Sequence, residues 1–562
     1  MLREPVQKQC KFAEIDIYQI SALGEIDIYQ ISALGEIDIY QILALGFISI
    51  LIYYFLIYPI TSPLWKVPGP YLYRISYIPS LNHQRKHRWI ERVYNLHQQY
   101  GPLVILSPNE LSVNGSQQFI IDIYLKNFPK SKFYQNFTNH GSKDNLFATL
   151  TNEKHLHYKK MITRLYSKSA IMSRENNTRE ILVDTTRKLV NVVHQSSVSG
   201  ELPDIYSVKP EFNPRAKSHK QDWFNKSKKN QSGKNLGIEV YTLFGAFAMD
   251  VISRFELGIN NGSDLLSNPV EREIIMKHRQ VSSMGFWTSF MPQFWVLAAT
   301  KLIKMAADDI TKFQLSLYAI AEKNPYPTTK GKNRTTLETL KSNGLEKDYA
   351  YSFLTDNLFA DVIDDLEKID QLQFLNSLLL ENSRVHASIP GAEPRIVDKE
   401  DYCVNGIHIP LGTTISCLPF ALHREPTVFP NAMAFVPQRW LPYPHESETT
   451  YKMRLKQQNK FMMPFGKGIR MCLGMNLAQL EIKLVIANLY WHYSSQLDPD
   501  WCHVTQDNTP IKLGSKWQGS NRTDQEMMCM NDAYTTNPVN DECWLRWFEH
   551  DTSEQSEIVE QH

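Results

Sequence analysis

One cysteine of the chain, Cys472, stands among residues that suit it for binding a metal. The stretch from Phe461 to Gly474 reads Phe-Met-Met-Pro-Phe-Gly-Lys-Gly-Ile-Arg-Met-Cys-Leu-Gly. It runs into a segment where leucines recur at positions 473, 477, 480 and 484, a spacing that predicts an amphipathic helix. Cys472 is therefore expected at a helix N-terminus, where free backbone N–H groups and the helix dipole favour the thiolate, the form of cysteine that binds metals.

The residues around the cysteine indicate a large, flat ligand that carries carboxylates. Gly466, Gly468 and Gly474 allow tight turns and a close approach to the backbone. Arg470 suits a carboxylate of the bound group, because its guanidinium matches carboxylate geometry. The plain alternative is a buried structural cysteine behind a glycine-rich loop, which is the ordinary role of a lone cysteine.

The pattern Phe465-x-x-Gly468-x-Arg470-x-Cys472-x-Gly474 resembles the haem-binding loop of the cytochrome P450 family and matches every fixed position of it. The resemblance implies a mainly α fold with small β-sheets (α+β). It also implies haem as the cofactor, these five residues as cofactor-binding residues, and Cys472 as the thiolate ligand of the iron.

Two further motifs of that family occur upstream of the loop. Glu381 and Arg384 lie three residues apart on a predicted helix, so their side chains share one face. A buried pair of this kind needs a further partner for the guanidinium donors. The resemblance implies Arg439 as that partner, from the segment Phe435-Val-Pro-Gln-Arg-Trp440, in a structural network that holds the haem loop without taking part in the chemistry.

Three other basic residues occupy places where the family contacts the haem propionates. His155 and Lys159 are four residues apart and share a helix face, and Arg395 begins a predicted strand. Lysine stands at 159 where arginine is commoner in the family, which makes that contact less fixed in geometry. A solvated basic helix face remains the alternative for His155 and Lys159.

The chain departs from the family where oxygen is activated. The segment Leu354–Asp365 resembles the beginning of the central distal helix, yet residues 366–371 lead directly into the helix of Glu381. By comparison with the family, part of the distal helix and the following helix are missing, and with them the acid–Thr pair, so we assign no catalytic residue. Either an exon is absent from this sequence or the protein is degenerate, and as written it is expected to bind haem poorly and to oxidise little.

Several other segments of the sequence predict local structure. Residues 101–113 alternate as a strand pair with a Pro-Asn turn, and Asn405-Gly406 predicts a hairpin. Residues 207–235 are polar and read as a solvated insertion. Residues 282–300 are apolar and aromatic. The resemblance implies a roof over the substrate cavity that touches the membrane, and core packing between helices is the alternative.

Three N-terminal segments precede the predicted catalytic domain. Residues 1–38 carry most of an eleven-residue repeat, Glu-Ile-Asp-Ile-Tyr-Gln-Ile-Ser-Ala-Leu-Gly, found at 14–24, 25–35 and, altered, at 36–46. Residues 39–58 are uncharged and long enough to cross a bilayer. Residues 59–70 are rich in proline and predict a stiff hinge that ends the helix, so that residues 71–562 form the catalytic domain.

The charge and the cysteine content of the chain restrict its expected partners and its cellular compartment. The 562 residues carry 60 basic and 59 acidic side chains, so nothing points to nucleic acid. Seven cysteines without a CxxC pair fit a reducing compartment. Basic residues follow the predicted span (Arg74, Arg85, Lys86, Arg88 and Arg92), which favours a cytoplasmic domain. With the family resemblance, this predicts a single-pass protein of the endoplasmic reticulum membrane.

The resemblance implies a haem-thiolate monooxygenase, an oxidoreductase that hydroxylates or oxidises an apolar small molecule with O2. Electrons would come from NADPH through NADPH–cytochrome P450 reductase, and the thiolate would aid O–O cleavage. The segment 533–544 resembles the ends of fungal members in secondary metabolism, which favours polyketide or terpenoid biosynthesis. The alternatives are a haem-thiolate isomerase or dehydratase, which needs no acid–Thr pair, and an inactive membrane haem protein.

Overall fold

The structure is a computed structural model that describes residues 39–138, 145–173, 177–195, 237–325, 335–342, 366–499, 501–502, 513–515 and 524–550. The chain divides into two compact units, Met1–Ser62 and Pro63–His562, and each is described by itself. The repeats before residue 39, the polar insertion at 207–235 and the segment Leu354–Asp365 lie outside the described residues.

The described part of the first unit is one helical run. It consists of α2 (Ile39–Ile52), a π-helical turn η2 (Tyr53–Ile57) and α3 (Tyr58–Thr61). Ile39–Thr61 is long and apolar enough to cross a membrane. The helix continues through Pro59, beyond the end expected at residue 58. In the π turn the N–H of Tyr58 bonds the carbonyl of Tyr53, a wider winding of the kind that accommodates disruptions within helices.

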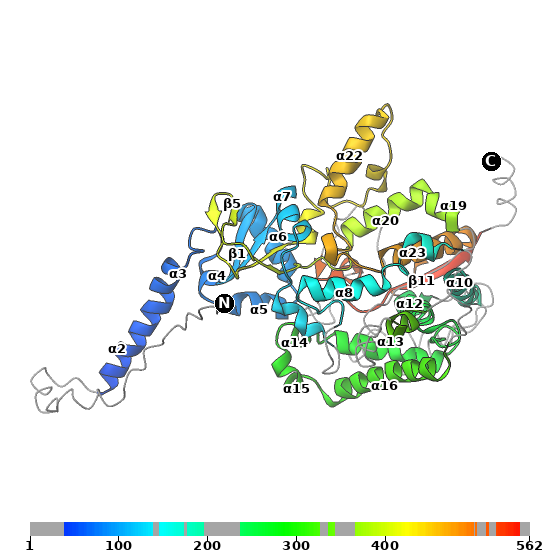
Figure 1. The fold of residues 1–562 in the computed structure, drawn as a ribbon, viewed down its shortest axis with the longest axis horizontal. Coiled ribbons are helices and arrows are strands. Elements are labelled where there is room, and N and C mark those ends of the chain that lie inside the picture. The colour runs from blue at the N-terminus through cyan, green and yellow to red at the C-terminus, as the bar shows by residue number, and fades with distance from the viewer. Residues whose placement is uncertain are drawn as a thin grey trace, which may run out of the picture. The chain divides into compact units, whose positions relative to one another are not determined.

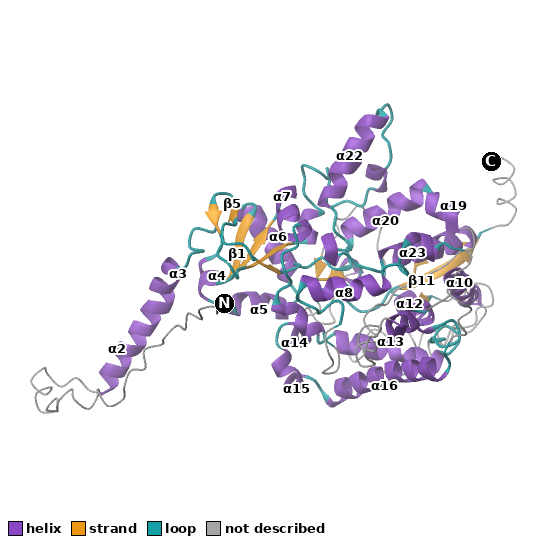
Figure 2. Cartoon of the chain, viewed as in Figure 1, coloured by secondary structure: helices purple, strands orange, loops and turns teal. Residues whose placement is uncertain are grey.

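The second unit is mainly helical, with small sheets, as expected from the sequence (Figures 1 and 2). Its longer helices are α5 (Ile78–Arg85), α6 (Trp89–Tyr100), α8 (Asn152–Ile162), α10 (Thr178–His194), α12 (Val240–Leu257), α13 (Pro269–Ser282), α16 (Lys301–Lys323), α17 (Thr336–Ser342), α19 (Leu366–Gln371), α20 (Gln373–Val385), α22 (Glu448–Phe461) and α23 (Met475–His492). The shorter ones are α4 (Tyr71–Ile75), α7 (Gln117–Ile120), η3 (Ile121–Leu125), η4 (Lys132–Phe137), α9 (Lys168–Ile171), α14 (Gly285–Ser289), η8 (Pro292–Phe294), α15 (Trp295–Ala298), α21 (Pro419–Leu422), η9 (Pro437–Trp440), η10 (Gly468–Arg470) and α24 (Asp524–Met527).

Within the described residues, four small sheets accompany the helices. The first has the order β1 (Leu103–Ser107), β2 (Glu110–Val113), β7 (Thr414–Cys417) and β4 (Arg395–Ile396), with only the β2–β7 pair parallel. A second sheet joins β3 (Ile238–Glu239), β11 (Trp544–Glu549) and β8 (Tyr493–Leu497). The other two are the pairs β5 (Cys403–Val404) with β6 (Ile407–His408) and β9 (Leu513–Gly514) with β10 (Met530–Asn531).

The local sequence predictions for these elements are confirmed. Residues 103–113 form the antiparallel pair β1–β2, and β5 and β6 form a hairpin. Its turn residues Asn405 and Gly406 both have positive φ angles, the conformation that a two-residue hairpin turn requires and that asparagine and glycine adopt most readily.

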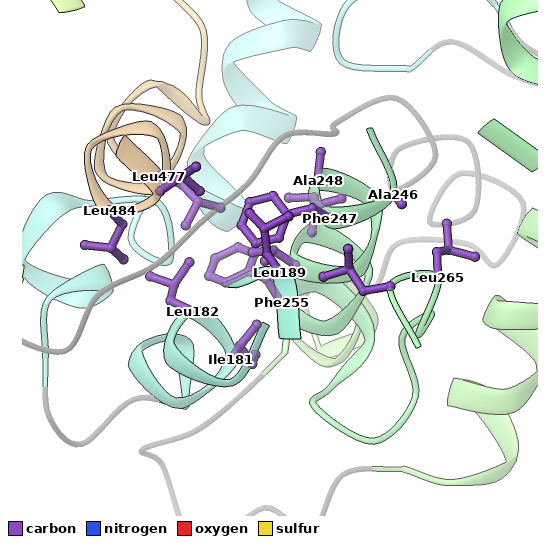
Figure 3. Close-up of a cluster of buried hydrophobic side chains, with 14 of the residues drawn as sticks. Ile181, Leu182, Leu189, Ala246, Phe247, Ala248, Phe255, Leu265, Leu477 and Leu484 are labelled. Carbon is purple, nitrogen blue, oxygen red and sulfur yellow. The ribbon is translucent and has the colours of Figure 1, made fainter. Parts of the chain in front are cut away.

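The described residues of the second unit form two hydrophobic cores. One is built by α10, α12 and α23, among other helices, and the other by α6, β1, β2 and β7 with the residues before the cysteine loop. Figure 3 shows Leu477 and Leu484 of α23 directed toward Leu182 of α10 in the first core. Phe461, Met462 and Met463 belong to the second core. Residues 464–476 therefore connect the two cores, and packing fixes both ends of the loop.

The buried face of α23 is mostly apolar but includes the carboxyl group of Glu481. Glu481 is completely buried, and neither of its carboxyl oxygens has a hydrogen-bond partner within the described part of the chain. Burial raises the pKa of this carboxyl well above its ordinary value. Burial thus favours the protonated form of Glu481 in the folded protein, whereas in the unfolded chain the carboxyl ionises at its ordinary pKa.

This difference predicts a pH-dependent destabilisation. A raised folded-state pKa gives stability that is present at pH values below the ordinary glutamate pKa and is lost as the pH rises toward the folded-state value. Glu481→Gln should leave stability unchanged near pH 5 and raise the melting temperature at pH 8. Glu481→Met should gain about 1–3 kcal/mol at pH 8, since an unsatisfied buried polar group is also removed. Thermal unfolding at both pH values measures this, with exposed Glu448→Gln as the control. An equal loss for Glu481→Gln at both pH values would contradict it.

Candidate functional site

The cysteine loop is a closed backbone turn. The Cys472 N–H donates to the carbonyl of Phe465 at 2.8 Å, and the Gly466 N–H donates to that of Met463 at 3.0 Å. Gly466 and Gly468 have φ angles of 71° and 69°, which glycine adopts without strain. The loop thus brings Phe465 and Cys472, seven positions apart, into direct backbone contact.

Gly468 and Gly474, the two fixed glycines of the motif, have different surroundings. A Cβ on Gly468 would lie 2.2 Å from the carbonyl oxygen of Tyr124, so the protein's own backbone excludes any side chain there. A Cβ on Gly474 would meet no atom of the described residues within 4 Å. The space above Gly474 is therefore open, as a large flat ligand next to Cys472 requires.

The Cys472 side chain is exposed and receives backbone hydrogen bonds from Gly474 and Met475, at the start of α23. The surrounding protein displaces water and raises the pKa of the thiol, and those two N–H groups and the Lys159 ammonium oppose the rise. The two backbone N–H groups at the helix start favour the thiolate, as expected from the sequence, but desolvation outweighs them and leaves the pKa raised. A cation bound at the sulfur is what would make the thiolate the stable form.

Arg470 and Lys159 bind the loop to α8 and to the residues before it. Arg470 donates from all three guanidinium nitrogens, to the side chain of Asn152 and to the carbonyls of Thr149 and Leu150. The Lys159 ammonium donates to the carbonyls of Ile469 and Met471, each at 2.8 Å. Contact with backbone carbonyls differs from the expected contact with propionates, and in this arrangement both cations hold the loop.

Arg395 and His155 lie buried near the same loop. Arg395 donates to the Tyr134 hydroxyl at 2.8 Å and lies 3.4 Å from the Glu393 carboxylate. His155 is 4% exposed, and its Nδ1 has no partner among the described residues. Burial and the charges of Arg470, Lys159, Lys130 and Arg395 lower its pKa to about 3. The structure therefore gathers the predicted basic residues around one place.

This cluster of basic side chains is evidence on whether the chain can bind haem. Five basic side chains influence one another there: Lys130, His155, Lys159, Arg395 and Arg470. Within the described part of the chain, the acidic side chain Glu393 acts on Lys130 and Arg395. A buried excess of positive charge is costly unless an anion compensates it. A group with two carboxylates beside the open space over Gly474 supplies that compensation, so the residues present fit haem.

The Glu-x-x-Arg pair and Arg439 meet in one buried network. The carboxylate of Glu381 accepts from Arg384 at 2.7 and 2.9 Å, from Arg439 at 3.1 Å and from the Trp440 indole at 2.9 Å. Burial opposes ionisation of Glu381, yet these bonds and charges lower its pKa. The carboxylate stays ionised and fastens α20 to η9.

His423 links this network to the cysteine loop, and no sequence motif marked it. The Met463 N–H donates to its Nε2 at 2.9 Å, so the ring proton is on Nδ1, which lies 3.2 Å from the carbonyl oxygen of Arg384. Burial and the nearby Arg424 and Arg384 lower the pKa of His423 to about 3, which keeps it neutral. The signal available was only a histidine upstream of the Phe-x-Pro-x-Arg-Trp segment.

Aromatic rings from three distant segments meet in a cluster. Phe133 lies 5.4 Å from Phe290 and 5.1 Å from Tyr534, and Phe137 lies 5.4 Å from Tyr534, between ring centroids. Tyr134, next to Phe133, bonds Arg395, so the cluster adjoins the basic group. Within residues 282–300, Phe290 thus packs inward, while Phe294, Val296 and Leu297 are exposed.

Comparisons with known proteins identify what the chain and its fold are similar to. Residues 355–519 match the sequence model of the family Cytochrome P450. Cytochrome P450 monooxygenase hkm5 of Aspergillus hancockii is 35% identical over 24% of this chain and 24% of its own. Tryptophan 6-hydroxylase fscE of Fusarium equiseti is 24% identical over 79% of this chain and 88% of its own. The crystal structure of cytochrome P450DA heme domain is 13% identical and covers 87% of this chain and 98% of its own, with a TM-score of 0.59.

The helical fold, the open cysteine loop and the basic residues around it fit the binding of haem. The family match over residues 355–519 and the likeness to fungal monooxygenases over most of the chain support an oxidoreductase of the monooxygenase class. The segment Leu354–Asp365, which resembles the beginning of the family's distal helix, lies outside the described residues, and the sequence contains no Ala-Gly-x-acid-Thr motif.

The two glycines give a matched pair of variants. Gly468→Ala should destabilise the protein by about 1–3 kcal/mol or more, because the residue has a positive φ and the new methyl group meets the Tyr124 carbonyl. Gly474→Ala should change the stability of the haem-free protein by no more than about 0.5 kcal/mol, the usual effect of a substitution at a site without a clash. The same variant should bind haem more weakly, because the new methyl group enters the open space. Thermal unfolding and haem titration separate the two effects. A stable Gly468→Ala protein would contradict the loop geometry.

Proposed function

We propose that this protein is a membrane-anchored haem-thiolate monooxygenase that hydroxylates or oxidises an apolar small molecule in secondary metabolism, with a polyketide or a terpenoid as the substrate class. The observation that carries the proposal is the exposed sulfur of Cys472, which accepts hydrogen bonds at the start of α23 beside the open space over Gly474. When bound, the haem supplies the oxidising chemistry, and the protein supplies its ligand, position and surroundings.

The chain's own residues divide this work among themselves. Cys472 would ligate the iron, with Phe465, Gly468 and Gly474 shaping the loop around it. Arg470, His155, Lys159 and Arg395 would face the carboxylate side of the cofactor. The network of Glu381, Arg384 and Arg439 holds the loop through His423, so it positions the ligand and takes no part in the reaction.

An apolar substrate is supported by the aromatic cluster. Phe133, Phe137, Phe290 and Tyr534 present ring faces and edges next to the Arg395 end of the site. Rings of this kind bind apolar and aromatic molecules by burying their surface and by edge-to-face contacts. Tyr534 adds a hydroxyl group that could orient a polar substituent.

The anchor and the electron supply complete the proposal. Ile39–Thr61 would span the endoplasmic reticulum membrane once, and the basic residues between 74 and 92 would keep the following domain in the cytoplasm. NADPH–cytochrome P450 reductase would deliver the electrons there.

Labelled oxygen tests the proposal. Microsomes that contain the full chain and the reductase should consume NADPH and place one 18O atom from 18O2 in the product of an accepted polyketide or terpenoid. Cys472→Ala should abolish incorporation, because the iron loses its thiolate, while Cys403→Ala, an exposed cysteine outside the loop, should retain it. Conversion without incorporation of label would contradict a monooxygenase.

A second candidate follows from the absent acid–Thr motif. A haem-thiolate isomerase or dehydratase rearranges an already oxidised substrate and needs no delivery of protons to bound oxygen. Such an enzyme would convert its substrate without NADPH. An inactive membrane haem protein would convert nothing. Sequencing of the transcript across residues 360–372 separates these from a monooxygenase with a missing exon: an unbroken transcript favours the second candidate, and an additional segment favours the first.

A further inference from the structure

We propose that Lys130, which no motif marks, binds a carboxylate of the haem and thereby positions the cofactor. The inference rests on the proposed haem function and adds to it a residue from a different part of the chain. Lys130 lies between η3 and η4, and its backbone forms a bridge with Arg395. The neighbouring hydrogen bonds from Ile396 to Pro129 and from Ser131 to Pro394 fix that pairing.

The Lys130 ammonium is buried without an anionic contact in the described part of the chain. The residue is 7% exposed, and its Nζ donates to the carbonyl of Phe147 at 2.6 Å. The Nζ also lies 4.0 Å from the Tyr134 ring centroid and 4.1 Å from that of Phe147. An ammonium carries three donors, and one hydrogen bond with two ring faces leaves room for an acceptor of opposite charge.

The charges that face Lys130 are mostly of its own sign. Arg395 of β4 and Arg470 of the loop act on it, as does the carboxylate of Glu393, and Lys130 in turn acts on His155 of α8. Tyr134 and Tyr534 face Arg395 as well, but as neutral phenols. Glu393 lies 3.4 Å from Arg395, so its charge is already shared. Among the described residues, one carboxylate against this set leaves an excess of positive charge that attracts an anion.

The same environment sets the protonation of Lys130. Burial, and after it the charges of Arg395 and Arg470, lower its pKa well below the ordinary value, while Glu393 opposes them. A carboxylate bound at the ammonium would raise that pKa again. In the pH range between the two pKa values, haem binding therefore takes up one proton, and haem affinity falls as the pH rises.

Titration of the haem-depleted full chain tests the inference with two probes. Haemin has two free carboxylates, and haemin dimethyl ester has none. The wild type should bind haemin more tightly than the ester. Lys130→Met should weaken haemin binding about 10- to 100-fold, the value of a hydrogen bond between charged groups, and should leave ester binding unchanged. Lys130→Arg should keep haemin affinity and remove its decrease with rising pH, because arginine stays charged. Lys132→Met, an exposed lysine two residues away, serves as the matched control.

Three outcomes would overturn the inference. Equal haemin affinity in the wild type and Lys130→Met would show that the lysine holds no carboxylate, and the proposed function would stand. Equal losses for haemin and ester in Lys130→Met would show a structural role. A wild type that binds neither probe would overturn both proposals. Conversely, a preference for haemin that disappears in Lys130→Met supports the inference even if labelled oxygen shows no monooxygenase activity.

Discussion

The buried carboxylate of Glu381 is the interaction on which the rest of the site depends. It compensates Arg384 and Arg439 at once, and all three side chains are less than 5% exposed. Loss of one partner from such a group is costly, about 3–5 kcal/mol, because a buried charge is left without compensation. From this network His423 extends to Met463, where the cysteine loop begins. The position of Cys472 is thus determined by a charge network that does not touch it.

A second electrostatic constraint lies on the other side of the loop and is of the opposite kind. Around Glu381 the charges are balanced within the protein, whereas the basic residues near Arg395 exceed the available carboxylate of Glu393. Arg470 and Lys159 bond carbonyls, which satisfies their donors without neutralising their charge. A balanced network suits a permanent support, and an unbalanced one suits a site that an anionic cofactor completes. The two arrangements together explain how the loop is held in place and still left open.

The sequence predicted the parts of this site that local spacing encodes. Glycine positions, the Glu-x-x-Arg pair and the helix after Cys472 follow from short-range geometry, as does the hairpin at Asn405. Other contributors could not be predicted because they depend on pairings between distant segments. Lys130 reaches the site through its bridge to Arg395, and Tyr534 through ring contacts with Phe133. The net rise in the Cys472 pKa could not be predicted for a related reason, since desolvation depends on everything packed around the thiol.

The central claim is that Cys472 of this chain binds haem iron as a thiolate, and the absorption spectrum of the reduced, CO-bound protein tests it most directly. The account predicts that the purified full-length protein, reconstituted with haemin, shows the shifted Soret band characteristic of thiolate ligation. It also predicts that Cys472→His loses this band while haem remains bound. A wild-type protein that binds haem without the shifted band would contradict the account.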